Sequence, residues 1–175
     1  TTPKELCQRA TDGLSLFFTD LDKRFVEVRE IPKMGRSAVD SNLVFLDGLP
    51  VPRKDLSGEE DRGFEYILNG FNPERILIGA EAVGIGVQAL NRAVDYARNR
   101  IVFDRPIGQN QAIQHPLAEN WMELQSAFLV CMEAAHLYDA GKPAGALANA
   151  AKYLGAEAGY RAATQSVLTH GGMGY

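Results

Sequence analysis

The sequence predicts an α+β chain, in which a short antiparallel β segment precedes an up-down bundle of three long helices. Apolar residues alternate with polar ones in residues 1–56, but recur every three or four positions farther along the chain. Breaks at Pro106–Gly108, Gly141–Pro143 and Gly171–Gly172 then divide the helical part into three stretches. We therefore expect two domains, residues 1–56 and residues 57–175.

Three apolar runs in the first domain predict short strands. They lie at Leu14–Phe18, Phe25–Ile31 and Leu43–Leu46, and turn signals such as Asp47-Gly48 separate them. Three short strands with one alternating apolar face need more sheet to bury that face. The prolines of Pro50–Pro52 are predicted to end the strand region, and the charged segment after them is predicted as a connector.

Asn72 and Pro73 predict the start of the first long helix. Asparagine is a good N-cap, and proline in the first helical position loses no hydrogen bond. Apolar side chains then recur at helical spacing as far as Ala97. The second and third helices are expected at about residues 112–140 and 144–169, and their lengths suit an antiparallel bundle.

The sizes of side chains on the first two helices predict close approach at some positions and core packing at others. Gly79, Gly84 and Gly86 are small, so another backbone or a flat ligand can come close to the first helix. Trp121 and Met122 on the second helix are predicted to fill the core.

Composition argues against several functions. The chain has 175 residues, a net charge of -4 and 46% hydrophobic residues, which is typical of globular proteins and predicts no nucleic-acid partner. No apolar run is long enough for a membrane span, and the three histidines lack metal-ligand spacing, so no metal site is predicted. Cys7 and Cys131 are predicted as free thiols in the cytoplasm, or in the mitochondrial matrix if the source is eukaryotic.

Glu74 and Arg75 form the first cluster that is able to carry chemistry. An acid in the first turn of a helix is stabilised by about 0.3–1 kcal/mol through the helix dipole, which is the simpler interpretation of Glu74. The functional interpretation is a general base that removes a proton next to a thioester carbonyl. The residues themselves leave both interpretations open.

The second cluster is Arg100, Phe103 and Gln111, around the break between the first two helices. These residues are either a solvated Arg, a core Phe and a loop Gln, or an anion site, because Arg makes paired contacts to phosphate and Gln pairs with sugar or base edges. The third cluster is the ending THGGMGY, whose glycines predict either a helix cap and turn or a backbone stretch close to a cofactor.

The segments FNPER, YARNRIVFDRPIGQNQAIQ and THGGMGY resemble the acyl-CoA dehydrogenases in their order and spacing. The resemblance runs from the end of that family's middle β domain into its C-terminal four-helix domain. It implies an FAD-dependent oxidoreductase of fatty acid metabolism that removes the α-proton of an acyl-CoA and passes the β-hydride to flavin. It also implies a homodimer or homotetramer, with electron-transferring flavoprotein as electron acceptor.

The resemblance implies roles for individual residues. Glu74 would be the catalytic base and Arg75 its orienting partner, although most members carry their base beyond the position of Tyr175. The implied substrate-binding residues are Phe71, Asn72, Pro73, Glu74 and Arg75. The implied cofactor-binding residues fall into two groups. Arg100 and Gln111 would contact the FAD of a neighbouring subunit, with Phe103 packed beside it. Leu168, Thr169, His170, Gly171 and Gly172 would line FAD through their backbone.

Two positions depart from the family pattern. Asp104 stands where many members have Gly, and Leu168 stands where many have a Gln that contacts FAD.

Compared with members of that family, the chain is expected to be a truncated portion of a longer enzyme, without catalytic turnover of its own. The first helical domain, most of the β domain and the fourth helix have no counterpart in it. Two other functions stay open. One is an acyl-CoA oxidase or flavin monooxygenase on the same fold. The other is a non-catalytic helical assembly module, which would bind no flavin and would tolerate changes at Arg100 and Gln111.

Overall fold

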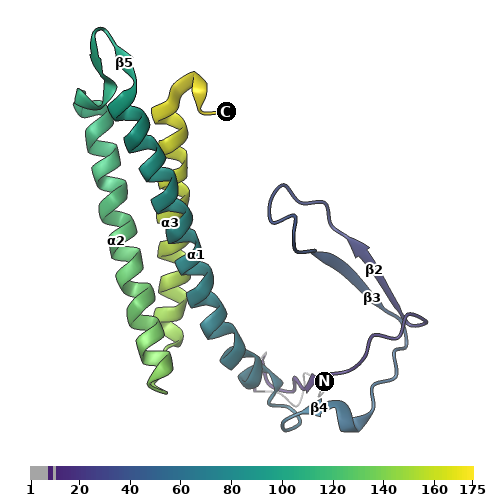
Figure 1. Ribbon diagram of the computed structural model, residues 1–175. Helices are drawn as coiled ribbons and strands as arrows, with labels where there is room; N and C mark the ends of the chain where they lie inside the picture. Colours follow the sequence, from purple (N-terminus) through teal and green to yellow (C-terminus); the bar gives the residue numbers. More distant parts are fainter. Residues whose placement is uncertain (1–7, 10) are drawn as a thin grey trace. The chain divides into compact units, whose positions relative to one another are not determined.

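The computed structural model describes residues 8, 9 and 11–175, so Cys7 lies outside the described residues. The chain divides into two compact units, Thr1–Leu68 and Asn69–Tyr175. Short antiparallel strand pairs come first and three long helices follow (Figure 1). The predicted α+β class is therefore confirmed.

In the described part of the first unit, the named strands form two antiparallel pairs. β1 (Leu16–Phe17) pairs with β4 (Leu56–Ser57), and β2 (Val26–Glu30) pairs with β3 (Asn42–Leu46). Apart from Val26, the residues of β2 and β3 are exposed. Within the described residues, the β2–β3 ribbon therefore leaves its apolar side chains exposed, as expected for short strands that need more sheet to bury them.

The strand β4 was not predicted, because Pro50 and Pro52 were expected to end the strand region. The chain instead passes through a short 3₁₀ turn, Arg53–Asp55, and pairs again. The backbone N–H of Phe18 donates to the carbonyl of Asp55 at 2.9 Å, and the hydroxyl of Thr19 donates to its carboxylate at 2.7 Å. This pairing joins segments far apart in sequence, so local periodicity does not reveal it.

The start of the first long helix was predicted wrongly. α1 spans Gly63–Asn99, so Asn72 is not its N-cap and Pro73 lies inside it. A proline inside a helix lacks the N–H for one backbone bond and costs about 3 kcal/mol. The earlier start is held by contacts within the first unit, where the N–H of Gly63 donates to the carbonyl of Leu14 at 2.6 Å. Tertiary contacts thus outweigh the local preference.

The second unit is the helical bundle. α2 (Gln111–Asp139) and α3 (Gly145–His170) run beside α1, close to their predicted bounds (Figure 1). The hairpin of β5 (Ile101–Val102) and β6 (Arg105–Pro106) joins α1 to α2. The 3₁₀ turns Ile107–Gln109 and Gly171–Met173 precede α2 and follow α3. The main core cluster draws on all three helices: Val83, Leu90, Ala93, Ala97, Leu117, Leu124, Ala127, Ala158 and Ala162.

α1 and α3 approach each other through glycine. A Cβ added at Gly155 would lie 2.5 Å from the carbonyl oxygen of Gly79, and one at Gly159 would lie 2.4 Å from that of Ala82. These distances admit no side chain without movement of backbone. The predicted approach of another backbone to Gly79 is confirmed, whereas a Cβ at Gly84 would meet no described atom within 4 Å.

The buried stripe of α2 explains a wrong core prediction. It repeats at Leu117, Leu124 and Cys131, and Trp121 and Met122 fall outside it and are both more than half exposed. Cys131 is a free, buried thiol, and burial raises its pKa. Within residues 8, 9 and 11–175, no helix is long and apolar enough to cross a membrane.

Candidate functional site

The predicted site residues lie at two ends of the helical unit. From Arg75 to Asn99 the axis of α1 rises about 36 Å at 1.5 Å per residue. We call the end with Phe71–Arg75 the Arg75 end, and the end with Arg100 and the β5–β6 hairpin the hairpin end. The C-terminal residues lie at the hairpin end (Figure 1).

At the Arg75 end, three predicted residues contact one another. Arg75 is half-buried, and its guanidinium donates to Oδ1 of Asn72 at 3.0 Å and lies 5.7 Å from the ring centre of Phe71. Asn72 also faces the start of α3, because a Cβ added at Gly145 would lie 3.7 Å from its amide. The structure therefore joins the start of α3 to this part of α1.

Glu74 is placed differently from its neighbours. It is exposed and, in the part of the chain that the structure describes, its carboxylate has no hydrogen-bond or ion-pair partner. It also lies well inside α1, so the interpretation as a first-turn acid is wrong. Adjacent residues point about 100° apart on a helix, which is why Arg75 bonds to Asn72 and not to Glu74. The carboxylate is thus available to another molecule.

At the hairpin end, Phe103 and Asp104 form the two-residue turn of the β5–β6 hairpin. Their φ angles are 51° and 60°, as in a type I′ turn, which is usually made by Asn and Gly. Phe103 is 93% exposed, so it is not a core residue. A bulky residue held in the left-handed region and exposed to solvent marks this turn as a candidate contact site.

The turn gives a stability prediction. Asp104→Gly should raise the free energy of unfolding by about 0.5–1 kcal/mol, because glycine adopts positive φ without a clash of Cβ. Asp95→Gly, at an exposed position in the helical interior of α1, should lower it by about 0.3 kcal/mol, the difference in helix propensity between Asp and Gly. Urea unfolding of the intact protein measures both, and a loss of stability in Asp104→Gly would contradict the turn geometry.

The start of α2 adds features that suit an anion. Gln111 is exposed in the first turn, Gln111–Gln114, which contains no Asp or Glu. Asn110 precedes it, and its amide accepts a hydrogen bond from Arg105 at 2.8 Å and donates one to Ile107 at 2.9 Å. Arg100 is exposed nearby in sequence. Free N–H groups at a helix start together with guanidinium groups favour a bound phosphate.

At the end of α3, backbone groups are more accessible to a ligand than polar side chains are. Thr169 is buried and its hydroxyl donates to the carbonyl of Gln165 at 2.8 Å. His170 stacks on Tyr96 with ring centres 4.3 Å apart, and its Nδ1 donates to the carbonyl of Ser166 at 2.7 Å. The side chains of Thr169 and His170 therefore both make their contacts inside the helical bundle. Gly171 and Gly172 after them are exposed, and Gly171 has a φ of 58°.

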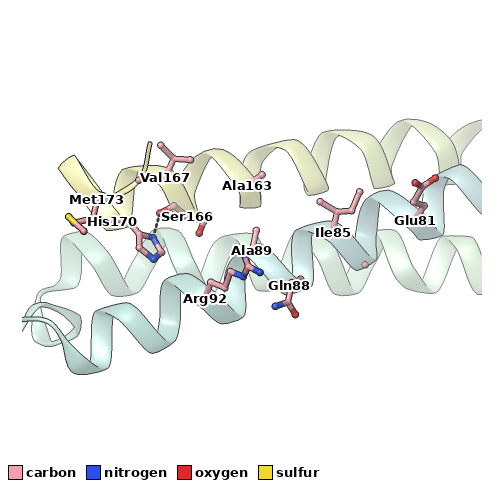
Figure 2. A pocket seen from close by; sticks show the side chains of 12 residues that line it. Glu81, Ile85, Gln88, Ala89, Arg92, Ala163, Ser166, Val167, His170 and Met173 are labelled. Atoms are coloured by element: carbon pink, nitrogen blue, oxygen red, sulfur yellow. Dashed lines mark hydrogen bonds between the residues drawn. The ribbon is translucent and has the colours of Figure 1, made fainter. Parts of the chain in front are cut away.

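A groove between α1 and α3 was missed by sequence reasoning. Its volume is about 740 Å³, and Figure 2 shows polar side chains from both helices along it. Among its lining residues are Glu81, Ile85, Gln88, Arg92, Ser166 and His170. The available signal was the spacing of residues 81, 85, 88 and 92, which places them on one face of α1. Of the predicted cofactor residues, His170 lines this groove.

Comparison with known proteins decides the family. Residues 61–175 match the model of the acyl-CoA dehydrogenase C-terminal domain. The chain belongs to the acyl-CoA dehydrogenase family. This confirms the resemblance seen in its motifs.

The similarity extends to named relatives and to a solved structure. Over 133 residues the chain is 47% identical to an acyl-CoA dehydrogenase of Mycobacterium bovis, covering 75% of this chain and 34% of that protein. Over 169 residues it is 32% identical to cyclohexane-1-carbonyl-CoA dehydrogenase of Geobacter metallireducens, covering 96% and 44%. The structure of butyryl-CoA dehydrogenase from Megasphaera elsdenii matches with a TM-score of 0.89 and 28% identity, covering 99% and 45%. The chain therefore spans between a third and a half of these relatives' length.

Proposed function

We propose that the chain is part of an FAD-dependent acyl-CoA dehydrogenase, which removes hydrogen from the α and β carbons of an acyl-CoA thioester. The observation that carries the proposal is family membership combined with the exposure of Arg100, Phe103 and Glu74. The cyclohexane-1-carbonyl-CoA and butyryl-CoA dehydrogenases among the relatives are named for acyl-CoA substrates, which supports the substrate class.

The hairpin end fits the dinucleotide part of FAD. Arg100 offers paired N–H groups to a pyrophosphate, Phe103 offers an exposed aromatic ring, and Gln111 lies where the α2 start favours an anion. At Gly171 and Gly172 a Cβ would meet no described atom within 4 Å, so a flat group has room to approach their backbone. FAD, when bound, accepts the two electrons that the acyl chain loses.

The Arg75 end fits the acyl-CoA reaction. In our proposal the exposed carboxylate of Glu74 takes the proton from the α carbon and holds it on a carboxylate oxygen. In the described structure the guanidinium of Arg75 makes no hydrogen bond or ion pair with Glu74. Its bond to Asn72 and its contact with Phe71 fix the helical turn from which Glu74 projects. Phe71, Asn72 and Pro73 complete the proposed substrate contacts.

The distance between the two ends supports a homo-oligomer. One end carries the proposed base and the other the proposed dinucleotide contacts, about 36 Å apart along α1. We infer that the hairpin end of one copy contacts the FAD of another, in a dimer or tetramer. We also propose that residues 1–56 end a middle β domain and residues 57–175 belong to the C-terminal domain. Electron-transferring flavoprotein would accept the electrons, and the free thiol of Cys131 suits the cytoplasm.

Arg100→Met tests the proposed cofactor site. Loss of charged hydrogen bonds worth about 1.5–3 kcal/mol should weaken FAD binding about 10- to 150-fold in the intact protein. Arg98→Met, an exposed arginine in the last turn of α1 and outside the groove, is the control and should bind FAD normally. Flavin absorbance during dialysis and titration measures both. Equal retention in Arg100→Met would contradict the hairpin-end site, and an intact protein that binds no flavin would contradict the function itself.

A further inference from the structure

A stacked aromatic pair connects α1 to α3 at the hairpin end. The rings of Tyr96 and His170 lie with their centres 4.3 Å apart and their planes 29° apart, and both residues are half-buried. Among the residues that the structure describes, this is the one stacked ring pair. Such pairs have a preferred geometry and contribute beyond the apolar area that they bury. The pair therefore joins the two helices at one defined point.

On α1, the stacked ring belongs to the residue that binds the backbone of Arg100. The N–H of Arg100 donates to the carbonyl of Tyr96 at 2.8 Å, and the carbonyl of Arg100 accepts from the N–H of Ile107 at 2.9 Å. The backbone of Arg100 is thus bonded to the stacked residue on one side and to the turn before α2 on the other. A shift of Tyr96 would therefore carry Arg100 with it.

On α3, the stacked ring belongs to the residue directly before Gly171. The Nδ1 of His170 donates to the carbonyl of Ser166 at 2.7 Å, which fixes the imidazole against its own helix (Figure 2). Gly171 then turns the chain away from α3 with a φ of 58°, and its N–H donates to the carbonyl of Leu168. The stack therefore holds the residue from which the exposed backbone of Gly171 and Gly172 continues.

The helix backbones approach each other farther back along α1. A Cβ added at Gly86 would lie 2.9 Å from the Cα of Gly159, and Gly86 is ten residues before Tyr96, about 15 Å along the axis. From there toward the hairpin end, the groove of about 740 Å³ lies between α1 and α3. The separation of the two helices at the hairpin end is therefore set by the ring pair more than by backbone contact.

We propose that Tyr96 and His170 are positioning residues, whose stack holds Arg100 and the backbone of Gly171 and Gly172 at the separation that the cofactor requires. This inference rests on the proposed function, which assigns both segments to FAD. The stack acts through these segments, and neither ring needs to touch the cofactor. A separation that is already formed lowers the ordering cost of binding, so the stack raises the affinity without adding a contact.

Tyr96→Leu in the intact protein tests the proposal. The substitution removes one stacked ring, so FAD should bind about three- to tenfold more weakly in a titration followed by flavin absorbance. Tyr96→Phe keeps the ring and should bind FAD within about twofold of the wild type. Tyr138→Leu, in the last turn of α2 at the Arg75 end, is the control for a general loss of stability and should bind FAD normally.

Double variants separate positioning from general destabilisation. Because both rings belong to one contact, Tyr96→Leu/His170→Leu should bind FAD no more weakly than the weaker of the two single variants. Combined with Arg100→Met, Tyr96→Leu should weaken binding less than it does alone, because part of its effect passes through Arg100. In the flavin-free protein, hydrogen exchange at the amides of residues 171–174 should be faster in both single variants than in Tyr96→Phe.

Wild-type affinity in Tyr96→Leu would overturn the inference. Equal weakening in Tyr96→Phe or Tyr138→Leu would also overturn it, as would effects that add in the double variants. An intact wild type that binds no FAD would overturn the proposed function together with the inference. FAD binding that does not depend on the stack would overturn the inference alone, so the two failures are distinguishable.

Discussion

Replacing Glu74 by glutamine is expected to lower the turnover of the intact protein on the order of 10³-fold. Glutamine keeps the shape of the side chain but does not accept a proton at neutral pH. Glu74 is exposed and has no partner in the described structure, so the change breaks no hydrogen bond or ion pair. The flavin should therefore stay bound and the fold should stay unchanged, which separates a chemical defect from a structural one.

Anaerobic titration with a panel of acyl-CoA thioesters measures this effect. Flavin absorbance should bleach in the wild type with the preferred acyl chain, and bleach far more slowly in Glu74→Gln although the thioester still binds. Glu133→Gln, at an exposed acid on α2, is the matched control and should behave as the wild type. Equal bleaching in wild type and Glu74→Gln would place the base elsewhere in the intact protein. Rapid reoxidation of the reduced flavin by O₂ would favour the oxidase alternative.

Much of the helical unit follows from local signals. Pro143 and the glycines after α3 bound helices whose apolar positions repeat at helical spacing, so α2 and α3 were placed within about two residues. The start of α1 could not be predicted from local signals. The hydrogen bond from the N–H of Gly63 to the carbonyl of Leu14 links residues far apart in sequence, and it outweighs the preference of Pro73 for the first turn of a helix. The pairing of β1 with β4 was not predicted for the same reason, because it also joins segments far apart in sequence.

In the candidate site, the order of the motifs could be predicted from the sequence, whereas the local geometry could not. The sequence order of the motifs identified the family, and a family model for its C-terminal domain confirms it. The hairpin turn at Phe103 and Asp104 was not predicted, since this pair lacks the usual Asn-Gly signature. The stack of Tyr96 on His170 joins residues far apart in sequence, so local signals do not reveal it either.

Gly155→Leu is expected to cause a large loss of stability, about 3–5 kcal/mol in the free energy of unfolding. A Cβ at this position would lie 2.5 Å from the carbonyl oxygen and 3.0 Å from the Cα of Gly79. These are backbone atoms of a packed helix, so relief requires α1 and α3 to separate. Gly84→Ala is the control on α1, where a Cβ meets no described atom and glycine is replaced by a better helix former. It should raise stability by about 0.5–1 kcal/mol.

Thermal and urea unfolding of the intact protein would measure both variants, with flavin content followed in parallel. α1 carries Glu74 and ends at Asn99, just before Arg100, and α3 runs into the segment Leu168–Gly172. The glycine contact between these helices therefore sets the position of both ends. Gly155→Leu should therefore lose flavin and acyl-CoA binding at temperatures where Gly84→Ala keeps both. If Gly155→Leu were as stable as the wild type, α1 and α3 would have to lie farther apart than the structure shows, and the two proposed ends would not be held by this contact.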